Sequence, residues 1–285
     1  MGRSIRRHIP NALVHVVQRC HNRASLLIGP GDKLAYLKAL RETAVQMNYG
    51  VVSYCVMDNH IHLLLRTPPV IRNHTLAAFM HRLNNRFGHR FNKFHGRSGT
   101  LWSTRYRPKW VPFSALRLLK LIWYVEGNAS RRRDRPIEAS KWPWCSAYWF
   151  FRAKDGPVPS LLGEAMMMLL SGIPLEERPD SPTYLKTVLE VQKGPGWEAA
   201  IPHATKLRVD RRWLGCKTSR FGAKLPNDTA KTAPEREGDS VGRWDSGIER
   251  RALAALPGCK PENQETRLFP PRRRRRRKAR LPDLV

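Results

Sequence analysis

The chain has 285 residues, of which 41% are hydrophobic, and it carries 52 Lys and Arg against 23 Asp and Glu. The formal net charge of +29 disfavours compaction and favours an anionic polymer as the partner. Acidic residues are scarce in residues 1–150, and the run Arg272 to Arg280 is almost entirely cationic. A nuclease site that cages two metal ions with carboxylates is therefore a strained interpretation for the first half.

No apolar stretch approaches the ~18 residues that span a bilayer, and the N-terminus lacks the apolar core of a signal peptide. The five cysteines are scattered and include no Cys-x-x-Cys pair. This usage disfavours a zinc finger and indicates reduced thiols in a cytoplasm. We therefore expect a cytoplasmic protein that has no membrane partner.

Strands and helices alternate in the first predicted elements. A β-branched run predicts a strand at residues 13–18, and apolar residues at helical spacing predict a helix at 32–48, capped by Asp32. Two further strands are predicted at residues 51–57 and 60–66. The turn between them is short, so we expect an antiparallel hairpin.

The next predicted elements are a helix at residues 76–94, an extended segment at 101–111 and a helix from Ser114 to about Gly127. The resulting β-α-β-β-α-β-α order predicts an α+β fold. Its expected core is a ferredoxin-like or RRM-like antiparallel sheet with helices on one face.

The composition changes beyond this core. We predict a first domain at residues 1–152 and a helical extension at 153–215, with helical patches near 161–170 and 184–191. Residues 216–285 are rich in Pro, Gly and charge, which predicts a basic and largely disordered C-terminal tail.

Two histidines stand two residues apart on the predicted strand 60–66. His60 and His62 therefore share one face of that strand, while Ile61 and its apolar neighbours share the other. The apolar face can pack under helices while both imidazoles face outward, as a two-histidine metal site requires. Chance alone gives such a motif in roughly a third of chains with this composition. The alternative, two half-exposed histidines that contact phosphate, therefore stays open.

One face of the helix that begins at Ser114 collects four polar residues: Arg117, Lys120, Tyr124 and Asn128. The two cations favour the phenolate form of Tyr124, whose ordinary pKa is about 10. The amide oxygen of Asn128 is a hard ligand suited to a divalent metal. The alternative is an amphipathic helix whose tyrosine packs at the boundary of the core.

Tryptophans crowd the segment from residue 102 to residue 149, between arginines and lysines: Trp102, Trp110, Trp123, Trp142, Trp144 and Trp149. Aromatic faces beside cations suit single-stranded nucleic acid, whose bases stack and whose phosphates pair with cations. The alternative is that at least half of them are core residues, with Trp123 and Trp144 the first expected there.

Five sequence blocks lie in order between residues 8 and 150, at 8–19, 54–65, 99–106, 124–128 and 142–148. The second reads Tyr-Cys-Val-Met-Asp-Asn-His-Ile-His-Leu-Leu-Leu, and the fourth is Tyr-x-x-x-Asn. Together they resemble the HUH single-tyrosine transposases, and within them the REP-associated tyrosine transposases. The chain departs from the family after its fourth block, where Ala-Ser-Arg stands in place of the usual Pro-x-Arg.

The resemblance makes residues 1–152 an HUH transposase-like catalytic domain. It implies a metal-dependent endonuclease and strand transferase of DNA transposition and recombination, acting on single-stranded hairpin or palindromic DNA such as a REP element. His60 and His62 would bind Mg²⁺ or Mn²⁺ with Asn128 as third ligand, and Tyr124 would form a 5′-phosphotyrosine. The family often acts as dimers, so we expect a homodimer as one assembly. We also expect a nucleoid-associated protein of prokaryotic type.

The candidate DNA contacts are cations of the N-terminal arm, of helix 76–94 and of the later motifs: Arg3, Arg6, Arg7, His81, Arg82, Arg86, Arg90, Arg105, Arg117 and Lys120. The Arg272 to Arg280 run suits a non-specific polyanion contact or a solvated tail better than sequence reading.

Two other function classes stay open. One is a non-catalytic RRM-like nucleic-acid-binding protein derived from a transposase, against which the intact His/His/Tyr set argues. The other is a ribosomal or RNA-packaging protein, which the composition alone favours. That class gives no reason for His-x-His and Tyr-x-x-x-Asn to occur together.

Overall fold

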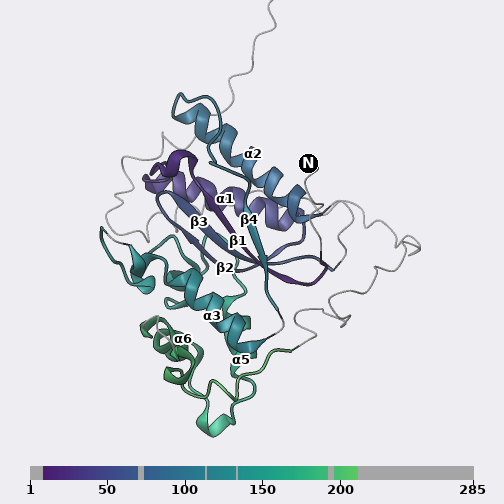
Figure 1. Cartoon of the computed structure of the whole chain (residues 1–285), viewed down its shortest axis with the longest axis vertical. Coiled ribbons are helices and arrows are strands. Elements are labelled where there is room, and N and C mark those ends of the chain that lie inside the picture. The colour runs from purple at the N-terminus through teal and green to yellow at the C-terminus, as the bar shows by residue number, and fades with distance from the viewer. Residues whose placement is uncertain (1–8, 70–73, 113, 133, 192–195, 211–285) are drawn as a thin grey trace, which may run out of the picture.

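The computed structural model describes residues 9–69, 74–112, 114–132, 134–191 and 196–210 (Figure 1). Its strands are β1 (Leu13–Arg19), β2 (Gly50–Val56), β3 (His60–Arg66) and β4 (Arg107–Trp110). Its helices are α1 (Pro30–Gln46), α2 (Leu76–Phe94), α3 (Ala115–Glu126), α4 (Ser146–Phe150), α5 (Leu162–Leu170) and α6 (Ser181–Glu190). Short 3₁₀ helices lie at His21–Arg23, Ala129–Arg131, Ala139–Lys141, Leu175–Glu177 and Trp197–Ala200.

The four strands form one antiparallel sheet in the order β2-β3-β1-β4. The elements follow one another in the predicted β-α-β-β-α-β-α order, so the α+β fold and its ferredoxin-like sheet are confirmed. The two central strands are β1 and β3, and Val17 of β1 lies opposite His62 of β3. The predicted metal-binding strand therefore has a hydrogen-bonded neighbour on each side.

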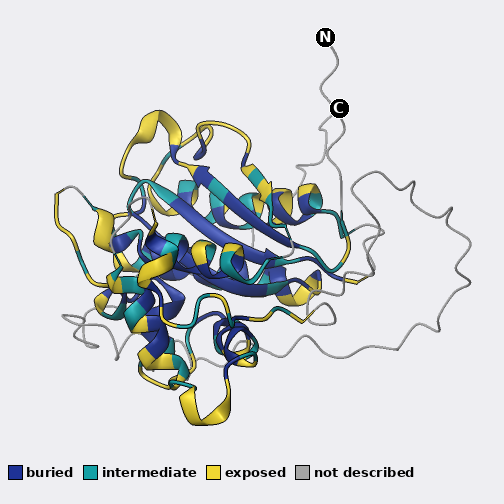
Figure 2. Cartoon of the chain, turned by 60° about the horizontal axis from the view of Figure 1, so that its bottom comes forward, coloured by how far each residue is buried: buried dark blue, intermediate teal, exposed yellow. Residues whose placement is uncertain are grey.

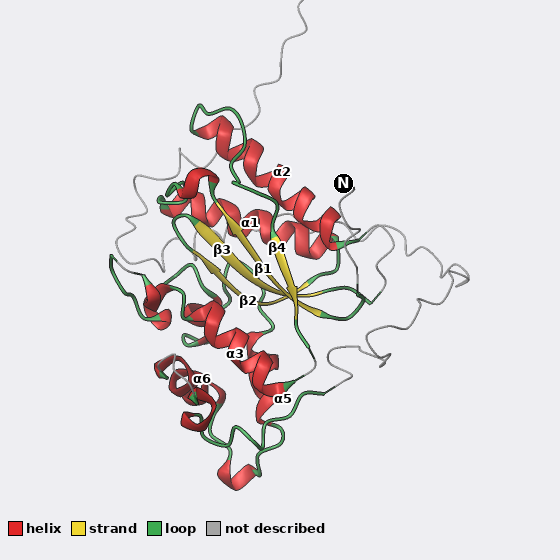
Figure 3. Ribbon diagram, in the orientation of Figure 1, coloured by secondary structure: helices red, strands yellow, loops and turns green. Residues whose placement is uncertain are grey.

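Helices cover both faces of the sheet. Figure 3 shows α1 and α2 together on one side and α3 on the other. The sequence predicted helices on one face only. This prediction is wrong for α3, which lies on the opposite face from α1 and α2. It packs over β2 and β3, where the apolar residues Leu118, Ile122 and Val125 are buried. The polar side of β3 is thus covered by the helix that carries Tyr124.

Two elements, α1 and β4, begin or end at residues other than those predicted. Asp32 does not cap α1, which begins after Gly29; its carboxylate lies 2.7 Å from the His95 ring nitrogen instead. The fourth strand is shorter than the predicted extended segment and contains Pro108. Proline has no N–H for a sheet hydrogen bond, which restricts it to an edge strand such as β4.

The C-terminal extension packs against the outer edge of β2. The Leu161 amide donates a hydrogen bond to the Val51 carbonyl at 2.8 Å, and the Ser160 hydroxyl donates to the Val52 carbonyl. This contact covers an edge that would otherwise be open to pairing. The predicted boundary at residue 152 stays a prediction, and the predicted tail at 216–285 lies outside the described residues.

Most of the clustered tryptophans belong to the core, as the second interpretation of them predicted. Trp102, Trp123, Trp142, Trp144 and Trp149 are buried, and Trp110 is partly buried. Figure 2 shows the buried residues concentrated in the sheet and in the sides of the helices that face it. The described part of the chain has no helix with the length and apolar composition for crossing a membrane.

Candidate active site

His60 and His62 lie on the α3 side of β3, as the alternation of the strand predicts. Ile61 and Leu63, on the opposite side, are fully buried. His62 itself is only 3% exposed, so it lies beneath α3 and not on an open surface. The half-exposed alternative therefore does not describe His62.

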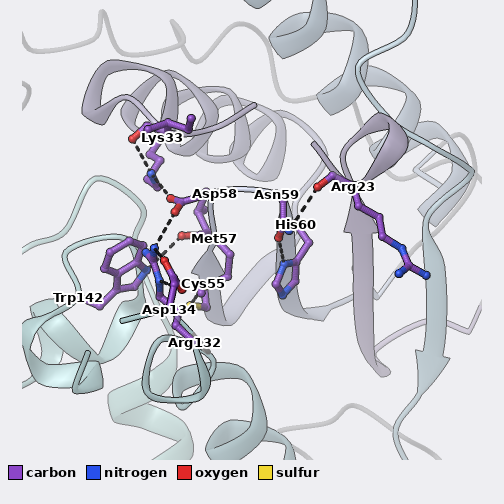
Figure 4. Close-up of polar contacts among 12 residues, drawn as sticks. Arg23, Lys33, Cys55, Met57, Asp58, Asn59, His60, Arg132, Asp134 and Trp142 are labelled. Atoms are coloured by element: carbon purple, nitrogen blue, oxygen red, sulfur yellow. Dashed lines mark hydrogen bonds and ion pairs between the residues drawn. The ribbon is translucent and has the colours of Figure 1, made fainter. Parts of the chain in front are cut away.

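The orientation of His60 is set by the turn that precedes it (Figure 4). Its Nδ1 lies 2.6 Å from Oδ1 of Asn59, while Nδ2 of Asn59 donates to the Arg23 carbonyl at 3.5 Å. Because Oδ1 only accepts, the His60 proton sits on Nδ1. The Nε2 lone pair of His60 is therefore left for another partner.

The turn between β2 and β3 is held by a second set of charges, also drawn in Figure 4. Asp58 accepts from the buried Lys33 ammonium at 2.8 Å and from Arg132 at 3.0 Å. Lys33 also donates to the Ile28 carbonyl, and Arg132 lies over the Trp142 ring. These contacts connect α1, the turn that precedes His60 and the segment that follows α3.

His62 has a partner that the sequence did not single out. Its Nδ1 lies 3.1 Å from Nε2 of His15 on β1. The two rings are nearly coplanar, with an interplanar angle of 10° and centroids 5.3 Å apart. As in His60, Nδ1 is engaged, so Nε2 is the nitrogen of His62 that remains available.

The Tyr124 ring lies against these histidines. Its centroid is 5.3 Å from that of His62 and 5.6 Å from that of His15, with interplanar angles of 79° and 84°. His60 and His62 are themselves 5.0 Å apart, centroid to centroid. The tyrosine of the predicted Tyr-x-x-x-Asn motif and the predicted His-x-His pair thus meet in one place.

Asn128 follows α3 in helical conformation, at φ −62° and ψ −36°, one turn beyond Tyr124. Its amide nitrogen donates to the carbonyls of Tyr124 and Val125, at 2.7 and 3.1 Å. Its side chain also lies near the His60 ring. Because the nitrogen is already used, the oxygen is the side-chain atom that Asn128 keeps for another partner.

A buried carboxylate anchors α3 over the sheet. Glu126, two residues after Tyr124, is fully buried and accepts from Ser53 of β2 at 2.5 Å. It also accepts from the Ser146 hydroxyl and from the Ala147 amide. Burial raises the pKa of Glu126, and the hydrogen bonds from Ser146 and Ser53 oppose that rise.

An arginine lies over the outer side of Tyr124. The Arg131 guanidinium is 4.9 Å from the Tyr124 ring centroid and 4.8 Å from that of Trp123, and it donates to the Tyr124 carbonyl. A Cβ at Gly127 would lie 2.8 Å from an Arg131 nitrogen and 2.8 Å from the Trp123 carbonyl. Glycine at position 127 therefore makes room for this arginine.

The three histidines of the site are neutral at pH 7. Burial, together with the charges of its neighbours, lowers the pKa of His62 to about 2. Burial also lowers the pKa of His60 to about 4, assisted by Arg19, and that of His15 to about 4, assisted by Lys109. The neutral imidazole is the form that binds a metal ion.

The residues present fit a divalent cation. Nε2 of His60 and Nε2 of His62 are the ring nitrogens that Asn59 and His15 do not engage, and the Asn128 side chain lies near His60. Two imidazole nitrogens and an amide oxygen form a donor set that a divalent metal ion can use. Across the described ranges no group of three or more His, Cys, Asp and Glu has the arrangement of a metal site. The candidate set is therefore two histidines and an amide.

Three cations lie on the same side of the sheet as the histidines. On β4, Arg107 lies opposite Val17, which in turn lies opposite His62 of β3. Lys109 lies opposite His15 of β1. On β1, Arg19 lies opposite His60. The side chains of all three are exposed. Most contacts of α3 with the sheet are with β2 and β3, and Tyr124 also reaches His15 of β1, so the two cations of β4 lie beside the region that α3 covers.

The predicted DNA-binding residues are dispersed. Arg3, Arg6 and Arg7 lie outside the described residues. His81, Arg82, Arg86 and Arg90 are on α2, across the sheet from Tyr124, and Arg86 bonds to Thr43 and Gln46 of α1. Arg105 and Arg117 are exposed. Lys120 turns to the extension, 3.6 Å from Glu198 and over the Trp197 ring.

One protein family matches part of the chain. Residues 8–127 match the family described as "Transposase IS200 like". This stretch of the chain is similar to the IS200-like transposases. The match supports a transposase-like function. The sequence block with His60 and His62, and Tyr124 of α3, lie inside the matched range, whereas Asn128 is the first residue beyond it.

Two solved structures are remotely similar to this chain. "Structure of the REP associates tyrosine transposase bound to a REP hairpin" has 14% identity and a TM-score of 0.44, covering 56% of this chain and 92% of that one. A putative transposase from Deinococcus radiodurans R1 has 23% identity and a TM-score of 0.29, covering 44% of this chain and 95% of that one. No curated protein matches the chain.

Sequence reasoning missed His15, Asn59, Glu126 and Arg131 as parts of the site. His15 was visible as a polar residue in a β-branched strand, but its position beside His62 depends on strand register. Asn59 belongs to the second sequence block, but nothing in the sequence assigned it a role of its own. Glu126 stands two residues from Tyr124, and a lone acidic residue in an apolar helix is a signal for a buried anchor.

Proposed function

We propose that the chain is a metal-dependent single-stranded DNA endonuclease and strand transferase that acts on hairpin or palindromic DNA through a 5′-phosphotyrosine on Tyr124. The observation that carries the proposal is the contact of the Tyr124 ring with His62, 5.3 Å between centroids, beside His60 and Asn128. The family match over residues 8–127 supports the same reaction class.

Each residue has a role that its contacts suit. His60, His62 and Asn128 would hold Mg²⁺ or Mn²⁺ through two imidazole nitrogens and one amide oxygen. When bound, such an ion polarises a phosphate oxygen and neutralises developing charge. Tyr124 Oη would attack phosphorus in line and release a 3′-OH. A covalent phosphotyrosine conserves the phosphodiester bond energy, so rejoining needs no ATP.

The surface around the site would bind the DNA in two parts. Arg107, Lys109 and Arg19 flank the histidines and would contact phosphates of the single strand that enters the site. The cations of α2, on the other side of the sheet, would contact a hairpin stem. Dimerisation, a REP-like target and the domain boundary at residue 152 belong to the same proposal.

An adduct assay tests the proposal. Labelled hairpin DNA from the flanks of the gene is incubated with wild type, Tyr124→Phe or His62→Ala, in Mg²⁺, Mn²⁺ or EDTA, with Tyr184→Phe in the extension as a matched control. We expect an SDS-resistant adduct with metal for wild type and Tyr184→Phe, and none in the other reactions. Hairpin binding without an adduct in any metal would overturn the catalytic proposal in favour of a binding protein.

A further inference from the structure

We propose that His15 is a positioning residue for the site: its Nε2 accepts the Nδ1–H of His62 and thereby turns Nε2 of His62 to the metal ion. The inference rests on the proposed function, because it assigns His15 a task in the metal site described there. His15 is the one residue of β1 in ring contact with both His62 and Tyr124 among those the structure describes.

The geometry of the pair is that of a hydrogen bond between two imidazoles. The Nε2 to Nδ1 distance is 3.1 Å, and the ring planes differ by 10°. An imidazole lone pair lies in the plane of its ring, so near-coplanar rings direct the lone pair of one nitrogen at the proton of the other. A stacked pair without this bond would not need a close nitrogen contact.

The direction of the bond follows from the task of His62. A metal ligand needs its lone pair on Nε2, and a neutral imidazole carries one proton, so that proton must sit on Nδ1. Nδ1 of His62 then donates, Nε2 of His15 accepts, and His15 keeps its own proton on Nδ1. Metal-ligating histidines commonly donate their second nitrogen to an acceptor in this way.

His60 has the equivalent arrangement with a different partner. Its Nδ1 donates to Asn59 at 2.6 Å, as that of His62 would donate to His15. Each histidine is thus held from its Nδ1 side by a neighbouring side chain. Because His15 contacts Nδ1 of His62, it lies on the side away from the proposed metal and is not placed as a third histidine ligand.

His15 also supports the tyrosine. Its ring is 6% exposed and meets the Tyr124 ring edge to face, at 5.6 Å and 84°. A side chain at this position therefore sets the distance between the proposed nucleophile and His62. A shorter residue at position 15 would remove the packing of both Tyr124 and His62. A phenylalanine ring there would keep this packing and remove only the hydrogen bond to His62.

The test uses full-length protein with ¹⁵N-labelled histidine and three variants: His15→Phe, His15→Leu and His15→Gln. His89→Phe, at an exposed position of α2, is the matched control. NMR of the ring nitrogens gives the tautomer of His62 with Mg²⁺ present, and His62→Ala identifies its signals. We expect the Nδ1–H tautomer in wild type, His89→Phe and His15→Gln, whose amide oxygen still accepts.

In His15→Phe we expect the His62 tautomer to shift or mix and the affinity for Mn²⁺, followed by EPR, to fall about 10- to 100-fold. His15→Leu serves the same purpose if the phenylalanine variant does not fold. Unchanged tautomer and Mn²⁺ affinity in the folded apolar variant would overturn the role of His15, and so would an Nε2–H tautomer in wild type.

The two proposals fail differently. If wild type binds Mn²⁺ and forms the DNA adduct while His15→Phe behaves identically, His15 has only a packing role and the proposed function stands. If wild type neither binds Mn²⁺ nor forms an adduct, the proposed function fails and the assignment of His15 fails with it.

Discussion

Glu126 of α3 accepts a hydrogen bond of 2.5 Å from Ser53 of β2. This contact joins the helix of Tyr124 to the sheet of His60 and His62 through fully buried groups. The position of the tyrosine over the histidines therefore depends on a carboxylate that takes no part in the proposed chemistry.

Replacing this carboxylate weakens the fold and the site together. Glu126→Ala leaves the hydroxyls of Ser53 and Ser146 and the amide of Ala147 without their acceptor. We expect a loss of about 2 to 4 kcal/mol in the free energy of unfolding. Urea denaturation measures this loss, and a lower adduct yield in the folded fraction is expected with it. Glu176→Ala, at an exposed position, is the control and should change neither.

The stability that depends on Glu126 should vary with pH in one direction. Burial raises its pKa above the usual 4.5, so the folded chain holds this proton more tightly than the unfolded chain. The contribution to the free energy of unfolding therefore falls as pH rises from 4.5 through the folded pKa. Glu126→Gln has no such proton, so the difference in free energy of unfolding between wild type and this variant should narrow as pH rises above 4.5. A difference that widens contradicts the assignment.

Lys33 holds the turn before His60. It is 2% exposed and bonds to Asp58, which keeps Arg132 as a second partner. Lys33→Met should lower the free energy of unfolding by about 1 to 3 kcal/mol, since a partly buried carboxylate loses one of two cations. Lys154→Met, at an exposed position, should have no effect. Equal urea midpoints for Lys33→Met and wild type would show that Arg132 suffices.

Asn59 accepts from Nδ1 of His60 and so determines which ring nitrogen of His60 carries the proton. Replacing Asn59 should lower metal affinity more than it lowers stability. Asn59→Leu removes the acceptor for Nδ1, while Asn59→Asp retains one. We expect Mn²⁺ affinity about 10-fold lower or worse for the leucine variant and near wild type for the aspartate variant. Melting temperatures should stay close to that of wild type. The opposite order of affinities would show that charge, and not the tautomer, controls the site.

The cations of β4 should contribute to single-strand binding. In a Tyr124→Phe background, Arg107→Ala/Lys109→Ala should reduce the slope of log affinity against log salt by about 1.4 for an unstructured oligonucleotide. Arg82→Ala/Arg90→Ala on α2 should reduce affinity for a hairpin and leave that oligonucleotide unaffected. Lys154→Ala/Lys186→Ala is the matched pair in the extension. Equal slopes for the β4 variant and this control would remove β4 from the strand path.

The sequence predicted the local elements well because their signals are local. The alternation around Ile61 identified β3 with its observed bounds, and the helix 76–94 agrees with α2. The pairing of His15 with His62, the contact of Glu126 with Ser53 and the second helical face are set by strand register and tertiary packing. No spacing within the chain carries that information, so these features required the structure.

The candidate site residues also divide into those that local sequence motifs identify and those that only the fold can place. His60, His62 and Tyr124 were selected from their motifs, and the structure brings them within ring contact. The predicted DNA-binding cations were selected by charge alone, and those within the described residues occupy different sides of the sheet. Charge in a strongly basic chain indicates a class of partner and does not indicate which surface binds it.

The most direct measurement is mass spectrometry of the covalent adduct formed on a hairpin labelled at its 3′ end. We predict that the 3′ fragment remains attached to protein and that, after nuclease and protease digestion, a nucleotide mass lies on the peptide that contains Tyr124. The 5′ fragment should leave with a free 3′-OH. A nucleotide on any other tyrosine, or attachment of the 5′ fragment, would contradict the account.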